Sequence, residues 1–199
     1  MTTQAMTTQA GRYPTLATEL WQNQSQLRLI ILAVAGSLLL TLSAKVQVPF
    51  YPVPLTMQTF VVLAIGFAYG WKLGALTILL YLAQGSVGLP VFAGTPEKGI
   101  GIAYMMGPTG GYLLGFVFAA AACGWLAEKG WDRRGSTALA AMLIGTLIIY
   151  ALGLLWLGTL LGWDKPILQW GMVPFLPGDL VKIVLAMVVL PGAWKILKK

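Results

Sequence analysis

The sequence contains no histidine, and its only cysteine is Cys123. Without histidine, the chain lacks the usual general base of Ser–His and Cys–His catalysis and the usual nitrogen ligand of metal sites. A single cysteine forms no disulfide within the chain and no zinc cluster. We therefore predict neither a metal site nor a bound cofactor, and the absence of catalytic groups argues against an enzyme.

Charge is also scarce. Only 10% of the 199 residues are charged, and 58% are hydrophobic. Soluble proteins carry about 25% charged and about 45–50% apolar residues. Too few polar side chains are left to cover a water-exposed surface, so the composition predicts an integral membrane protein.

Long apolar segments predict an all-α, six-transmembrane-helix bundle, because a helix needs about 20 mostly apolar residues to cross a bilayer. If the second and third segments merge, five spans are the alternative. The predicted spans are Leu27–Ala44, Thr56–Tyr69, Leu73–Phe92, Gly110–Ala127, Ala138–Leu161 and Asp179–Leu197.

The distribution of Lys and Arg predicts that both termini are cytoplasmic, in a multi-pass membrane protein. External loops then hold three basic residues: Lys45, Lys98 and Lys165. Nine fall on the cytoplasmic side: Arg12, Arg28, Lys72, Lys129, Arg133, Arg134, Lys195, Lys198 and Lys199. We attribute the net charge of +7 to this topology and to attraction for anionic membrane lipid, not to nucleic-acid binding.

The membrane domain is predicted to comprise residues 27–199. Residues 1–26 are polar and are expected to form a disordered tail. The tail contains the tandem repeat MTTQA, which leaves both Met1 and Met6 open as the start of translation.

Small residues spaced four apart predict close helix packing, because backbones in a bilayer approach each other at such residues. One set is Gly66, Gly70 and Gly74. A longer set is Gly107, Gly111, Gly115, Ala119 and Cys123, in which the cysteine is interpreted as a small packing residue.

One charged pair lies within a predicted span, where charges are costly and usually functional. Asp179 follows Pro177 and Gly178 at the start of the last helix, and Lys182 is three residues further on the same face. A helix cap explains the aspartate. It does not explain a lysine one turn into an apolar helix, which a pocket for a polar ligand does explain.

Neutral polar and aromatic side chains extend this candidate site. Gln58 and Gln84 are amides within predicted spans, although such amides also satisfy neighbouring helices. Tyr51, Tyr112 and Tyr150 combine an aromatic body with a hydroxyl.

Four external motifs, rich in proline, glycine and aromatic residues, are expected to converge on a pocket that opens outward, with ordinary tight turns as the alternative. They are Lys45–Pro54 (KVQVPFYPVP), Gly88–Gly94 (GLPVFAG), Gly107–Gly115 (GPTGGYLLG) and Pro174–Lys182 (PFLPGDLVK).

The same regions contain four longer or equal runs: VQVPFYPVPLTMQTFVVL (Val46–Leu63), GLPVFAG (Gly88–Gly94), GPTGGYLLGF (Gly107–Phe116) and PFLPGDLVK (Pro174–Lys182). In this order they closely resemble the BioY family, the biotin-binding S components of energy-coupling factor (ECF) transporters. The resemblance covers about residues 27–197.

The resemblance implies a six-helix subunit that captures biotin from outside with high affinity. It also implies partners, namely a transmembrane coupling subunit and a pair of ABC-type ATPases. In such a site, Asp179 accepts from a ureido N–H, and Lys182 donates to the ureido carbonyl or to the carboxylate. Gln58 and Gln84 add polar contacts, and the aromatic residues pack around the rings of the ligand: Phe50, Tyr51, Phe92, Tyr112 and Tyr150.

A small-residue motif on the first helix contacts the coupling subunit in related S components. The matching positions here are Ala33 and Ser37. Judged from the residues alone, this face is equally an internal packing seam or a docking surface.

Three alternatives stay open. They are a stand-alone biotin permease, an S component for a different vitamin, and a structural subunit in which Asp179 and Lys182 only cap a helix.

Overall fold

Helices make up most of the computed structural model, which describes residues 13–20 and 25–197. Two short strands form one antiparallel pair in which Gln47 lies opposite Thr56. In chain order the elements are α1 (Leu16–Leu20), α2 (Gln26–Lys45), β1 (Gln47–Val48), β2 (Leu55–Thr56), α3 (Gln58–Ser86), α4 (Gly101–Met105), α5 (Gly110–Ala127), η1 (Trp131–Arg133), α6 (Gly135–Leu161), α7 (Ile167–Gly171), η2 (Val173–Phe175) and α8 (Leu176–Leu197).

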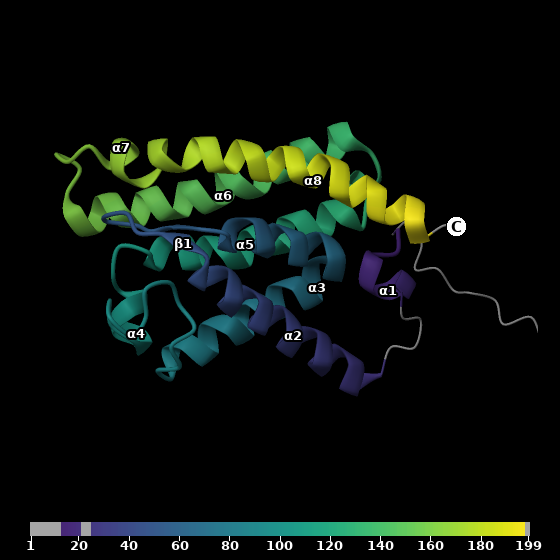
Figure 1. Ribbon diagram of the computed structural model, residues 1–199, viewed down its shortest axis with the longest axis horizontal. Coiled ribbons are helices and arrows are strands. Elements are labelled where there is room, and N and C mark those ends of the chain that lie inside the picture. The colour runs from purple at the N-terminus through teal and green to yellow at the C-terminus, as the bar shows by residue number, and fades with distance from the viewer. Residues whose placement is uncertain (1–12, 21–24, 198–199) are drawn as a thin grey trace, which may run out of the picture.

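The long helices form an elongated bundle with two different ends (Figure 1). The β1–β2 hairpin, α4 and α7 gather at one end, here called the loop end, and α1 lies at the opposite end with the C-terminus (Figure 1). Within the described residues, five helical segments are long and apolar enough to cross a membrane. The expected multi-pass membrane architecture is confirmed, and the number of crossings depends on the shape of α3.

α3 is two helical segments joined at Gly70, whose φ of 80° and ψ of 176° are not helical. A left-handed φ suits glycine because it has no Cβ. The two segments fold back on each other: a Cβ added to Gly74 would lie 3.2 Å from the Cα of Gly66. The second segment ends at Ser86, six residues before the predicted end at Phe92, so Phe92 lies in a loop.

Packing against α5 explains the spacing of the small residues. A Cβ on Gly66 would lie 2.5 Å from the carbonyl oxygen of Ala120, on α5. A Cβ on Gly115 would lie 3.0 Å from the Cα of Ile149, on α6. Cys123 is completely buried. The predicted packing role of these positions is therefore confirmed, with α5 between α3 and α6.

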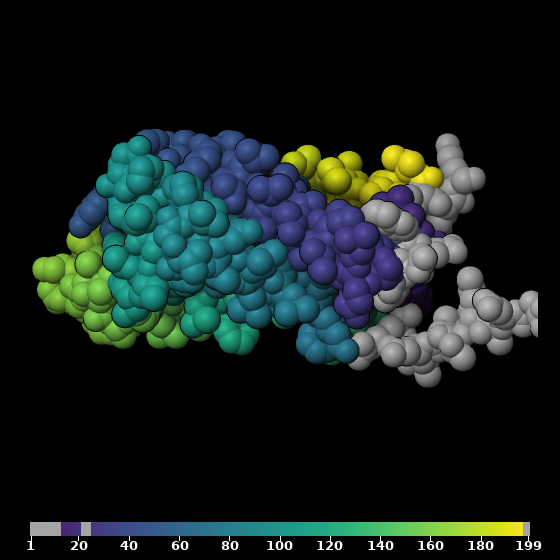
Figure 2. Space-filling model, turned by 90° about the horizontal axis from the view of Figure 1, so that it is seen from below, coloured from purple at the N-terminus to yellow at the C-terminus, as the bar shows by residue number. Residues whose placement is uncertain are grey.

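α2 lies on one face of the bundle, with residues of α3 and α4 beside it toward the loop end (Figure 2). Its outward side chains are apolar, and the exposed residues include Leu27, Ile30, Val34, Leu38 and Leu42. An apolar outer face suits a helix surrounded by lipid tails.

Part of the predicted N-terminal tail is described by the structure. Residues 1–12 and 21–24 of that tail lie outside the described residues, whereas 13–20 include α1. The backbone N–H of Tyr13 donates to the carbonyl of Glu128 at 2.7 Å. This contact ties the segment to the end of α5, a long-range pairing that local polarity does not reveal.

Candidate functional site

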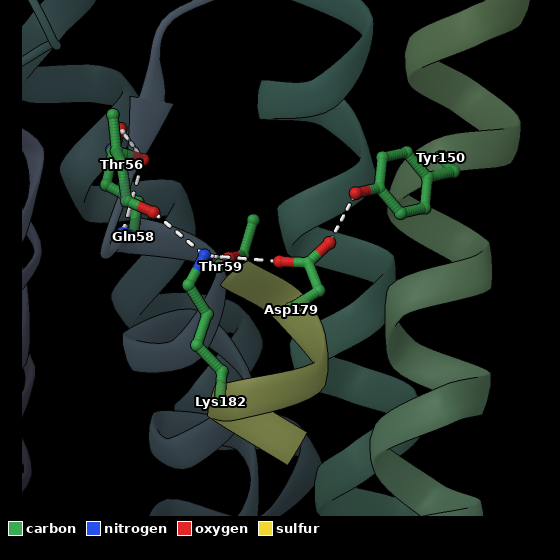
Figure 3. A network of polar contacts seen from close by, with 6 residues as sticks. All are labelled: Thr56, Gln58, Thr59, Tyr150, Asp179 and Lys182. Carbon is green, nitrogen blue, oxygen red and sulfur yellow. Dashed lines mark hydrogen bonds and ion pairs between the residues drawn. The ribbon is translucent and has the colours of Figure 1, made fainter. Parts of the chain in front are cut away.

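The polar centre of the molecule is the buried pair Asp179 and Lys182, near the start of α8. Lys182 Nζ lies 3.1 Å from Asp179 Oδ1, and the two side chains are 15% and 9% exposed. The hydroxyl of Tyr150, on α6, donates to the other carboxylate oxygen of Asp179 (Figure 3). α8 begins at Leu176, three residues before the predicted start, so Asp179 lies in its first turn rather than at the cap.

Lys182 also links α8 to the start of α3. Its ammonium group donates to the carbonyl of Thr56 at 3.0 Å and to the hydroxyl of Thr59 at 2.8 Å (Figure 3). An ammonium group has three N–H donors. With Asp179 as the third acceptor, all three are used, which holds this charge without help from solvent.

Asp179 keeps free capacity as an acceptor. Each carboxylate oxygen offers about two lone-pair sites, and each accepts one hydrogen bond here, Oδ1 from Lys182 and Oδ2 from Tyr150. The site therefore presents a negatively charged acceptor whose position is fixed from two sides. Such a group suits a ligand that brings N–H donors.

A cavity opens next to this pair at the loop end, where its walls come from the hairpin, α3 to α6, the loop before α4, and the start of α8. Its lining residues are Val53, Pro54, Thr56, Gln58, Thr59, Ala93, Tyr104, Thr109, Tyr112, Leu113, Phe116, Ile149, Tyr150, Phe175, Asp179 and Lys182. Apolar and aromatic side chains dominate, and the polar groups are few. This composition is typical of small-molecule sites.

Two tyrosines in the cavity wall donate hydrogen bonds from their hydroxyl groups to backbone carbonyls. Tyr112 donates to the carbonyl of Gly171 at 2.8 Å, and Tyr104 donates to that of Ala93 at 2.8 Å. Burial raises the pKa of the Tyr104 hydroxyl, which keeps it protonated and able to donate. Because these polar ends are satisfied, both rings act as shaped apolar walls.

Five of the eight predicted binding residues line the cavity together: Gln58, Tyr112, Tyr150, Asp179 and Lys182. The other three lie elsewhere. Tyr51 is 79% exposed, on the hairpin. Phe92 is buried behind the wall and stacks on Tyr104 at 4.9 Å between ring centroids.

Gln84 is on α3, and its amide oxygen accepts a hydrogen bond from the hydroxyl of Ser37 on α2. Ser37 is completely buried, and Ala33 is partly buried. At Ser37 the small face of α2 therefore packs against α3 within the chain, and the docking role of Ala33 and Ser37 stays a prediction.

Sequence reasoning missed Thr59 and Tyr104. Thr59 directly follows Gln58 and accepts a hydrogen bond from Lys182. Neither the hydrophobic periodicity nor the charge of this helix turn marks Thr59 as a site residue. Tyr104 lies in the short α4, bounded by Gly101 and Gly107, in a region without a predicted element. The glycines around it were the one local signal of an ordered, tightly packed loop.

The fold and the cavity together define a multi-pass membrane protein with a small-molecule site at one end of its helix bundle. Residues 15–199 match the model of the BioY family, and the chain belongs to that family.

Named relatives place the chain among transporters rather than enzymes. It is 38% identical over 164 residues to the probable biotin transporter BioY of Pyrococcus horikoshii, covering 82% of this chain and 93% of that one. It is 39% identical over 160 residues to the biotin transporter BioY of Thermotoga maritima, covering 80% and 92%.

The fold also matches a solved structure, the S-component for biotin from an ECF-type ABC transporter. The TM-score is 0.70 at 23% identity, covering 87% of this chain and 94% of that one. At this identity the match shows a shared fold.

Proposed function

We propose that the chain is a high-affinity biotin-binding S component of an ECF-type vitamin transporter. The observation that carries the proposal is Asp179, a buried acceptor fixed by Lys182 and Tyr150 at the edge of an aromatic cavity. The names of the relatives support biotin as the ligand.

The chemistry of biotin matches this cavity. Its ureido group has two N–H donors and one carbonyl, its thiophane ring is apolar, and its chain ends in a carboxylate. Asp179 takes a ureido N–H with its spare lone pairs, and the rings of Tyr112 and Phe116 pack on the apolar part. Lys182 serves the ureido carbonyl or the carboxylate by exchanging its contact with Thr59.

Capture takes place from outside, with both termini in the cytoplasm and six membrane-crossing helices. The fold-back of α3 at Gly70 supports the count of six. Near the loop end lie Lys45, Lys98 and Lys165, whereas the described basic residues at the opposite end are Arg28, Lys72, Lys129, Arg133, Arg134 and Lys195. This bias supports an outward-facing loop end.

Transport energy comes from partner subunits, a transmembrane coupling subunit and a pair of ABC-type ATPases. The sequence has no P-loop, so the chain itself has no means of hydrolysing a nucleotide. The structural match to an S-component supports this assembly.

Calorimetry on the detergent-purified chain tests the ligand, with biotin, thiamine and riboflavin compared under the same conditions. We expect tight binding of biotin alone. Binding of another vitamin instead would contradict the biotin assignment and make the chain an S component for that solute.

Uptake into proteoliposomes tests the partners. Biotin accumulation is expected only when the coupling subunit, the ATPases and ATP are all present. Equal uptake by the chain alone would identify a stand-alone permease and contradict the S-component assignment.

A further inference from the structure

Gln58 and Tyr81 are joined across the two segments of α3. Gln58 is the first residue of the helix, and its amide nitrogen lies 2.7 Å from the hydroxyl oxygen of Tyr81. The exposed fractions are 4% for Gln58 and 0% for Tyr81, so the contact is shielded from solvent. Gln58 lines the cavity, and Tyr81 lies behind it.

The direction of this hydrogen bond follows from the second contact of Tyr81. Its hydroxyl donates to the carbonyl of Val91 at 3.0 Å. A carbonyl only accepts, and a hydroxyl has one proton, so that proton is used on Val91. The oxygen of Tyr81 must then accept from Gln58, which turns the NH₂ group of the amide toward Tyr81.

The carbonyl oxygen of Gln58 is consequently placed on the side of Thr56, whose hydroxyl lies 3.4 Å away and which also lines the cavity. We infer that Tyr81 is a positioning residue for specificity. It holds Gln58 so that the cavity presents a second acceptor, beside that of Asp179, and thereby selects ligands with two N–H donors. This inference rests on the proposed function.

The ring of Tyr81 is held independently of its hydroxyl. It packs edge-on against Phe92, with ring centroids 5.4 Å apart and planes at 85°. Phe92 in turn fits against Gly85, where a side chain would collide with its ring. Tyr81→Phe therefore removes the two hydrogen bonds and keeps the packing.

A double-mutant cycle with biotin as the probe tests the inference. Dissociation constants are measured for the wild type, Tyr81→Phe, Gln58→Leu and the double variant. Tyr81→Phe is expected to weaken binding about tenfold, the effect of losing one oriented hydrogen bond. In the Gln58→Leu background this loss should vanish, because Tyr81 acts through the amide.

Tyr104→Phe is the matched control. Its hydroxyl also supports the loop wall, at Ala93, but forms no hydrogen bond with Gln58. Its effect should be the same with and without Gln58→Leu. If Tyr81→Phe behaves like this control, or leaves affinity unchanged, the inference is overturned and Tyr81 only supports the loop. Failure of the wild type to bind biotin would instead overturn the proposed function, and this inference with it.

Discussion

Lys182 on α8 donates to the carbonyl of Thr56 at 3.0 Å, although 126 residues separate them in the sequence. The same ammonium group holds Asp179. One side chain thus joins the last helix to the end of β2, just before α3, and keeps the acceptor of the cavity in place. Stability and ligand binding are coupled at this residue.

Lys182→Met should lower the free energy of unfolding by about 3 kcal/mol, the usual cost of leaving one charge of a buried pair without its partner. Unfolding in mixed detergent measures it. Lys165→Met is the control, because Lys165 and its partner Asp164 are 50% and 72% exposed, and a change under about 1 kcal/mol is expected. Equal losses in the two variants would contradict a buried structural role for Lys182.

Gly66→Ala should destabilise the bundle, because the added methyl group would lie 2.5 Å from the carbonyl oxygen of Ala120. Overpacking of this kind costs about 1–3 kcal/mol. Gly192→Ala, on α8, meets no heavy atom within 4 Å and should leave stability unchanged or slightly higher. Thermal melting of both variants checks the close approach of α3 and α5. A stable Gly66→Ala protein would show that the two helices separate easily.

The pH dependence of stability should depend on Asp132, in η1 at the end opposite the cavity. Asp132 is completely buried, and its Oδ2 accepts from the indole N–H of Trp194 at 2.6 Å. Its Oδ1 has no hydrogen-bond partner among the described residues. Burial raises the pKa of this carboxyl above its usual range, against smaller opposing effects from Trp194 and Arg133.

A raised pKa means that, over the pH range between the two pKa values, the Asp132 carboxyl keeps its proton in the folded state and has lost it in the unfolded chain. The stability contributed by Asp132 is then fully present below the unfolded pKa and is lost as pH rises through the folded pKa. Melting temperatures measured upward from about pH 4 should fall for this reason, starting near the ordinary aspartate pKa. Asp132→Asn should flatten that part of the profile. Parallel profiles of wild type and variant would rule out Asp132 as the cause.

The spacing of Asp179 and Lys182 and the cost of burying charge were enough to predict that the two side chains lie together in a polar pocket. Two charges three residues apart in an apolar helix need a local explanation. The same reasoning could not tell which of the tyrosines lie at the cavity. The hydroxyl of Tyr150 donates to Asp179, whereas Tyr51 is exposed and does not line the cavity, and only the tertiary arrangement of α6 and the hairpin decides this.

Gly70 shows a similar limit for the fold. Its spacing from Gly66 and Gly74 predicted close packing, which is correct. The partner of that packing includes the other segment of α3 itself, because one glycine with a positive φ reverses the chain. The apolar segment predicts a helix that ends at Phe92, but the helix stops at Ser86, ahead of the glycine and proline that follow.

The most direct test of the account is the affinity for biotin of Asp179→Asn compared with Tyr51→Phe. Asp179→Asn leaves Lys182 without its counter-charge and replaces one acceptor oxygen with a donor, so binding should weaken about 100-fold. Tyr51 is 79% exposed and outside the cavity, so Tyr51→Phe should bind like the wild type. Equal losses in the two variants, or full affinity in Asp179→Asn, would contradict a binding site built on Asp179.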